Sequence, residues 1–92
     1  MKVRLRTFAR FREVFGDGVE VDLAGGATLA DLLGVLRERY PEGGEALFDE
    51  AGSVKGYVIL LHNKTRVKRS DISKTVLSEG DEVAILPPVA GG

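Results

Sequence analysis

Apolar and polar residues alternate near the start of the chain, first from Lys2 to Phe8 and again from Val19 to Leu23. An alternation with a period of two residues predicts two strands, which we expect to pair antiparallel. Ala9 to Phe15 would form a short helical turn between them, ended by the turn residues Gly16-Asp17-Gly18. The first strand would present two faces, Val3, Leu5 and Thr7 on one and Lys2, Arg4, Arg6 and Phe8 on the other.

A helical period follows the second strand. Thr28 is a typical N-cap, and Asp31 stands where a carboxylate can reach back to it. Pro41 and Gly43-Gly44 should end this helix, and Glu45 to Glu50 would form a second, short one. The apolar residues recur at helical spacing and form one stripe: Leu29, Leu32, Leu33, Leu36 and Tyr40.

The second half of the chain returns to strand patterns. The apolar run Tyr57–Leu61 predicts a strand whose two faces are both partly covered. The remaining segments are a turn at 63–65, a short edge strand at 66–68, a turn at 79–81 and a final strand at 82–86. In the final strand, alternation places Val83 and Ile85 inward and Ala84 and Leu86 outward.

This order of elements fits one α+β architecture, the β-grasp or ubiquitin-like fold. A single long helix must cross between strands of one sheet, and the simplest packing lays its leucine stripe across one sheet face. We therefore expect a mixed sheet of four to five strands with one main helix on one face. Residues 1–86 would form this domain, and residues 87–92 a flexible C-terminal tail.

Composition narrows the chemistry further. The chain has 92 residues, enough for one domain, and a formal net charge of −1, which does not favour nucleic acid or an acidic membrane. The N-terminus has no continuous apolar stretch typical of a signal peptide, so we expect a cytoplasmic protein. Cysteine is absent and His62 is the one histidine. Thiolate nucleophiles, disulfides and cysteine-based zinc sites are thereby excluded, and we predict no metal site.

The last six residues are the most informative segment. Two prolines cannot extend a strand ladder, so Pro87-Pro88 should direct the chain off the sheet in an extended path. Val89, Ala90 and Gly91 then carry little bulk, and the five residues from Pro88 reach about 16 Å at about 3.3 Å each. From composition alone, the probability that this sequence ends in Gly-Gly is roughly 2%. The slender tail 87–91 is shaped to enter a partner's tunnel and to present the ionised Gly92 carboxylate there.

At this point the sequence resembles the MoaD/ThiS family of ubiquitin-like sulfur carriers, and within it the MoaD-like branch. Gly80 to Gly92 matches the end of that branch throughout: Gly-Asp-Glu-Val-Ala, two apolar residues, Pro-Pro-Val, a small residue and Gly-Gly. Phe8 to Glu13 resembles its Phe-Ala-x-x-Arg-Glu segment, Ala27 to Leu33 its helix start, and Asn63 its turn. Small archaeal modifier proteins share these features.

The resemblance implies that Gly92 is the reacting residue. An adenylating enzyme related to the ubiquitin activators would use ATP and magnesium to convert its carboxylate to an acyl-adenylate. A persulfide sulfur, supplied by a sulfurtransferase, would then give a thiocarboxylate. In molybdopterin synthase the tail inserts into a larger subunit and its sulfur goes to the cofactor precursor. This chain would bind no cofactor itself and would act as a sulfur-carrying subunit or co-substrate, not as a catalyst alone.

The sequence also indicates where a partner would dock. Arg6 and Phe8 on the first strand should share the outer sheet face with Leu86 on the last, because these strands are neighbours in β-grasp folds. Exposed apolar residues on a face without a helix suggest a docking patch. Where the MoaD-like branch often has an apolar residue, Arg66 departs from it, which predicts a more polar surface or a different partner.

Three functions remain open at this stage: the sulfur carrier, most simply the small subunit of molybdopterin synthase; a modifier joined to lysines through an isopeptide bond at Gly92; and a non-conjugated interaction domain with an inert tail.

Other features are interpreted as structural. His62 should be a surface or structural histidine, and the glycines at 25–26 and 43–44 should be turns. A basic cluster could meet an acidic partner or a phosphate, but a solvated turn is expected there: Arg66, Lys68, Arg69 and Lys74.

Overall fold

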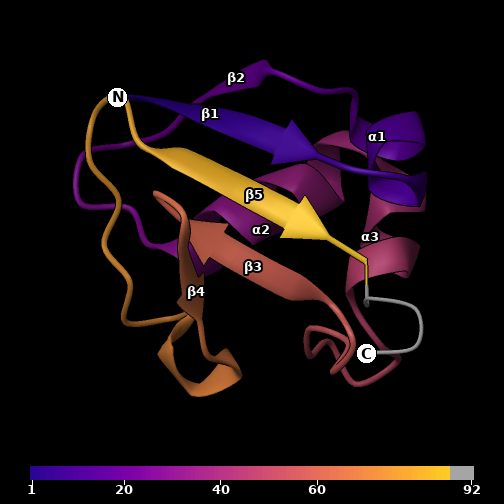
Figure 1. Cartoon of the computed structure of the whole chain (residues 1–92). Helices are drawn as coiled ribbons and strands as arrows, with labels where there is room; N and C mark the ends of the chain where they lie inside the picture. Colours follow the sequence, from indigo (N-terminus) through magenta and orange to yellow (C-terminus); the bar gives the residue numbers. More distant parts are fainter. Residues whose placement is uncertain (88–92) are drawn as a thin grey trace.

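The computed structural model describes residues 1–87 and contains one five-stranded mixed sheet (Figure 1). The strand order is β2-β1-β5-β3-β4; β1 and β5 are parallel, and the other neighbours are antiparallel. This is the β-grasp arrangement that the order of elements predicts. None of the helices in residues 1–87 is long and apolar enough to cross a bilayer. The strands are β1 Lys2–Thr7, β2 Val19–Asp22, β3 Ile59–His62, β4 Thr65–Val67 and β5 Glu82–Leu86.

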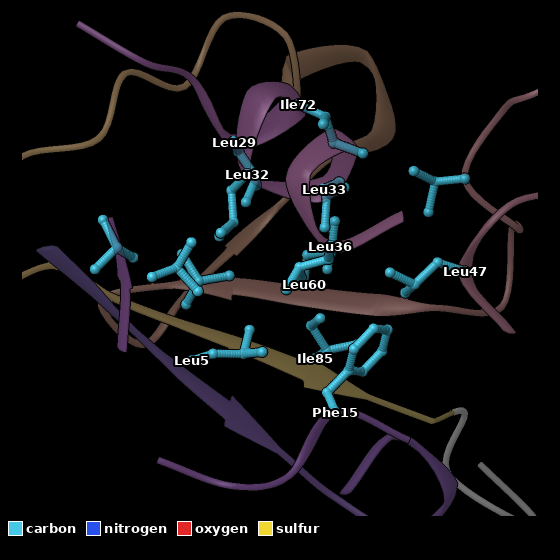
Figure 2. Close-up of a cluster of buried hydrophobic side chains, with 14 of the residues drawn as sticks. Leu5, Phe15, Leu29, Leu32, Leu33, Leu36, Leu47, Leu60, Ile72 and Ile85 are labelled. Carbon is cyan, nitrogen blue, oxygen red and sulfur yellow. The ribbon is translucent and has the colours of Figure 1, made fainter. Parts of the chain in front are cut away.

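The main helix packs on one face of this sheet. The helices are α1 Arg10–Phe15, α2 Leu29–Arg39, α3 Pro41–Leu47 and the short 3₁₀ helix η1 Arg69–Asp71. The predicted capping box starts α2: the Thr28 hydroxyl accepts from the Asp31 N–H (3.2 Å), and the Asp31 carboxylate accepts from the Thr28 N–H (2.8 Å). Figure 2 shows the leucines of α2 directed toward Leu5, Leu60 and Ile85 on the strands.

Strand β5 lies at the centre of the sheet, between β1 and β3. Val83 and Ile85 are fully buried against the core, as predicted. Ala84 is on the other face by alternation, yet it is only 7% exposed because Arg6 and Leu61 flank it in the register. Ala84 therefore belongs to the outer face, as predicted, and is covered there because its methyl group is shorter than the side chains of Arg6 and Leu61.

Both predicted boundaries of the second helix are wrong, and it ends at Leu47, three residues before the predicted Glu50. The short helix α3 begins at Pro41, four residues before the predicted Glu45, and contains Gly43 and Gly44 instead of a turn. Proline suits the first position of a helix, where no N–H partner is needed, so Pro41 starts a helix here as well as ending α2. Both glycines are buried: Gly43 lies against the Phe15 ring, and Gly44 against the side chain of Arg37. Both positions require glycine because α3 approaches α1 and α2 so closely that a Cβ would contact their side chains.

Two strand boundaries also shift. The structure starts β3 at Ile59, not at Tyr57, and Tyr57 is 51% exposed. It starts β4 at Thr65, because the tight turn uses only Asn63 and Lys64, both with positive φ (49° and 73°). Two residues with positive φ form the hairpin turn whose twist matches that of the flanking strands.

Asp17 anchors the loop between α1 and β2. Its carboxylate accepts hydrogen bonds from the Thr7 N–H (3.2 Å), Arg12 Nη2 (3.0 Å) and Arg6 Nε (3.0 Å). The Thr7 N–H, aided by the two guanidinium groups and opposed by partial burial, lowers the pKa of Asp17 to about 2. The loop is thereby fixed to the end of β1.

We expect Gly43→Ala to destabilise the fold. A Cβ at this position would overlap with the ring of Phe15, which is 2% exposed and packs edge-on against Tyr40, so it has no free space to move into. Overpacking of this kind costs about 1–3 kcal/mol of unfolding free energy, measurable by urea denaturation. The control is Gly34→Ala in α2, where nothing lies within 4 Å; it should be neutral or stabilising. Equal stability of the two variants would contradict this packing.

Asp17 should make stability depend on acid pH. Because its folded pKa is depressed, the carboxylate stabilises the fold above the unfolded pKa of about 4, and this contribution is lost as pH falls toward about 2. Urea midpoints at about pH 5 and about pH 2 should therefore differ less in Asp17→Asn than in the unaltered protein. Asp22→Asn, on exposed β2, should retain the full difference. An unchanged pH dependence in Asp17→Asn would overturn the assignment.

Candidate functional site

The outer face of the sheet, opposite α2, is defined by the strand register. One row runs across four strands: Arg6 pairs with Ala84, Ala84 with Leu61, and Leu61 with Arg66. Side chains in one such row share a face, because every second residue of a strand points the same way. The structure thus brings the predicted Arg6 and Arg66 to the two ends of one row.

A second row lies nearer the end of β5. Leu86 pairs with Ile59, and Phe8 follows β1 at the same end of the sheet. Phe8 is 38% exposed, whereas Leu86 and Ile59 are half-buried. The five apolar side chains of this face are called the outer-face patch: Phe8, Ile59, Leu61, Ala84 and Leu86.

Ile59 and Leu61 are absent from the residues that the sequence predicted for docking. The apolar run Tyr57–Leu61 hides the alternation, because residues of both faces are apolar there. The burial of Leu60, which is 2% exposed and belongs to the core, assigns its two neighbours Ile59 and Leu61 to the outer face, because successive strand residues point to opposite faces.

Charged residues border the patch. The Arg6 guanidinium lies 5.9 Å from the centre of the Phe8 ring and pairs with Asp17 at 3.0 Å, so its position is fixed beside the patch. Arg4 stands in register between Glu20 and Glu82, whereas Arg66 is exposed at the opposite side. The four residues predicted for docking, Arg6, Phe8, Leu86 and Arg66, therefore share one face; their docking role remains a prediction.

The chain leaves the sheet at the Phe8 end of the patch. Leu86 is the last residue in the ladder, and Pro87 follows it directly. The predicted tail residues Pro88, Val89, Ala90, Gly91 and the reacting Gly92 lie outside the described residues. The structure shows that β5 ends at Leu86, while the tail and the chemistry of its end stay predictions.

A cluster of titratable side chains lies at the start of β5, at the end of the strand away from Phe8. The Asp81 carboxylate lies 2.7 Å from His62 Nε2 and accepts from Asn63 Nδ2 (3.0 Å) and the Ser78 N–H (2.8 Å). Burial alone would raise the pKa of Asp81, but these hydrogen bonds outweigh it and lower it. The Asn63 side chain also accepts from the Glu82 N–H (2.8 Å). The cluster joins the β3–β4 turn to the start of β5, so we interpret it as structural.

The geometry can be compared with known proteins. Residues 5–92 match the ThiS family. The chain is 40% identical to small archaeal modifier protein 3 of Haloferax volcanii and 33% identical to the molybdopterin synthase sulfur carrier subunit of Chlamydomonas reinhardtii, and each alignment covers 100% of both chains. The crystal structure of small archaeal modifier protein 1 from Haloferax volcanii superposes with a TM-score of 0.85 at 30% identity, again over 100% of both chains. The chain therefore belongs to the ThiS/MoaD family of ubiquitin-like sulfur carriers and modifiers.

Proposed function

We propose that this protein is a sulfur carrier that is adenylated at Gly92 and converted to a thiocarboxylate. Its role would be that of the small subunit of molybdopterin synthase, donating sulfur in molybdenum cofactor biosynthesis in the cytoplasm. The observation that carries the proposal is the exit of the chain: the central strand β5 leads directly into Pro-Pro-Val-Ala-Gly-Gly, beside an exposed apolar patch. Relatives named as molybdopterin synthase sulfur carrier subunits, aligned over the full chain, support it.

The proposed chemistry needs only the terminal carboxylate of this chain. A carboxylate oxygen of Gly92 attacks the α-phosphate of ATP on an adenylating enzyme, and pyrophosphate leaves. The terminal sulfur of a persulfide then attacks the acyl carbon and displaces AMP, and a thiol cleaves the resulting disulfide to leave the thiocarboxylate. ATP and magnesium are held by the partner. Glycine suits both last positions, because a Cβ would hinder close approach of the partner's backbone to the acyl carbon.

Docking would use the outer-face patch. An adenylating enzyme or the larger synthase subunit would cover Phe8, Leu61 and Leu86 and receive the tail in a channel. Arg6 is already fixed by Asp17, so it would lose little side-chain freedom when a partner binds. The apolar centre with charged residues at its border is the composition typical of a protein interface.

A second function is favoured by one observation: the relative with 40% identity is named a modifier protein. In that case the acyl group would pass from the adenylate to a lysine amine and form an isopeptide bond. The two functions share adenylation and differ in the acceptor, so one protein can perform both. A non-conjugated interaction domain would instead retain its full binding activity after deletion of Gly91 and Gly92.

Gly92→Ala should abolish or strongly slow thiocarboxylate formation. Intact mass spectrometry of protein isolated from its native host should show the replacement of one oxygen by one sulfur in the unaltered chain and not in the variant. Gly25→Ala, in a loop where nothing lies within 4 Å, is the matched control and should be sulfurated normally. Equal sulfuration of both variants would refute the proposal. Branched Gly-Gly remnants on lysines of other proteins would identify the modifier function instead.

Phe8→Ala should weaken docking without unfolding the domain. Removal of a partly exposed aromatic anchor should raise the KM of the adenylating enzyme for this protein by about tenfold or more. Steady-state adenylation kinetics measure the effect, and circular dichroism checks the fold. Val76→Ala removes an apolar side chain that is 56% exposed but lies outside the patch, and it should leave the KM unchanged. Identical KM values for the two variants would show that the patch is not the docking surface.

A further inference from the structure

Charge is distributed unevenly along this chain. Residues 64–74 contain five lysines and arginines and one acidic residue, giving +4, so the rest of the chain carries −5. All five cations are exposed, and none forms an ion pair within residues 1–87. These residues are called the basic segment: Lys64, Arg66, Lys68, Arg69 and Lys74. They span β4, η1 and the turns around them, at one edge of the sheet.

A groove of about 310 Å³ adjoins the basic segment on the helix side of the sheet. Its apolar wall comes from three elements: Leu33 on α2, Phe48 and Val54 on the chain after α3, and Ile72 after η1. Ser53, Arg69 and Ser73 also line it and provide its polar side chains. This volume lies at the lower limit for ligand sites, which suits one or two apolar side chains of a peptide.

Arg69 also contacts the chain that leads into β3. A Cβ built on Gly56 would lie 3.4 Å from the Arg69 guanidinium, so Arg69 reaches from η1 to the chain before β3. Next to Gly56, Tyr57 is 51% exposed, and the Lys55 ammonium lies 5.9 Å from the centre of its ring. The structure thus places the Arg69 guanidinium beside Gly56, one residue before the exposed Tyr57.

We propose that the groove, together with Lys68 and Arg69 of the basic segment, forms a second docking site, which binds an acidic segment of a partner protein. One apolar side chain of that segment would occupy the groove between Leu33 and Ile72, and flanking carboxylates would pair with Arg69 and Lys68. The groove lies on the helix side of the sheet, whereas the outer-face patch and Arg66, in register with Leu61, lie on the other side. It does not depend on the proposed function, because it uses neither the patch nor the tail.

Three observations favour an acidic peptide over a nucleic acid as the occupant. The cations lie beside an apolar groove, which an apolar side chain can fill and a phosphate cannot. Within residues 55–74, Tyr57 is the only Phe, Tyr or Trp that could stack on a base, and the His62 ring is paired with Asp81. The rest of the chain carries −5, which would repel a long polyanion but would affect a short segment little beyond the Debye length of about 10 Å.

The test uses the full-length protein labelled with ¹⁵N and a synthetic heptapeptide, capped at both ends, with one central leucine and glutamate at all other positions. Amide shifts should change at residues of the groove and the basic segment. Arg69→Glu should weaken binding by about tenfold or more. The matched control is Arg39→Glu, the same charge change on exposed Arg39 at the end of α2, and it should bind normally. Circular dichroism checks that both variants fold.

Several results would overturn this proposal. A peptide with serine in place of leucine that binds equally well would show that the groove is unused. Shifts confined to the outer-face patch, equal effects of Arg69→Glu and Arg39→Glu, or no binding at millimolar peptide would each reject the site. An oligouridylate that shifts the same amides at lower concentration than the peptide would identify a nucleic-acid surface instead.

Discussion

The fold depends on the pairing of β5 with a strand on each side. Its ladders with β1 and β3 fix which residues face α2 and which face outward, since a slip of one residue would exchange the two sets. Val83 and Ile85 complete the core under the α2 leucines, and Ala84 and Leu86 complete the outer-face patch. One register therefore sets the stability of the domain, the composition of its outer surface and the point from which the tail departs.

Local patterns predicted most of the fold. Alternation in β1 and β5, the Thr28–Asp31 capping box and the leucine stripe of α2 each arise from neighbours in sequence, and each is confirmed. The errors concern contacts between distant segments. The sequence predicts a turn at Gly43, whereas the structure packs Gly43 against the Phe15 ring. The apolar run Tyr57–Leu61 does not show which residues face the core, whereas the structure buries Leu60. The register puts Arg6, Ala84, Leu61 and Arg66 in one row across the outer face, while the docking role of Arg6, Phe8, Leu86 and Arg66 stays a prediction.

The two candidate surfaces use the same few strands from opposite sides. Leu61 contributes to the outer-face patch, while Arg69 and Ile72, just after β4, contribute to the groove. The strands between them are held by the cluster of His62, Asn63 and Asp81, which joins the hairpin turn to β5. A partner on one side would therefore leave the other accessible, and a protein with the proposed carrier role could keep one contact while exchanging the other.

The central position of β5 also bears on biosynthesis. Of the five strands, the ribosome makes β5 last, although it belongs in the middle of the sheet. Until β5 emerges from the exit tunnel, the β1–β2 hairpin and the β3–β4 hairpin have no strand to join them, and the core under the α2 leucines lacks Val83 and Ile85. The nascent chain should therefore form its native sheet in one late step, after β5 has left the exit tunnel.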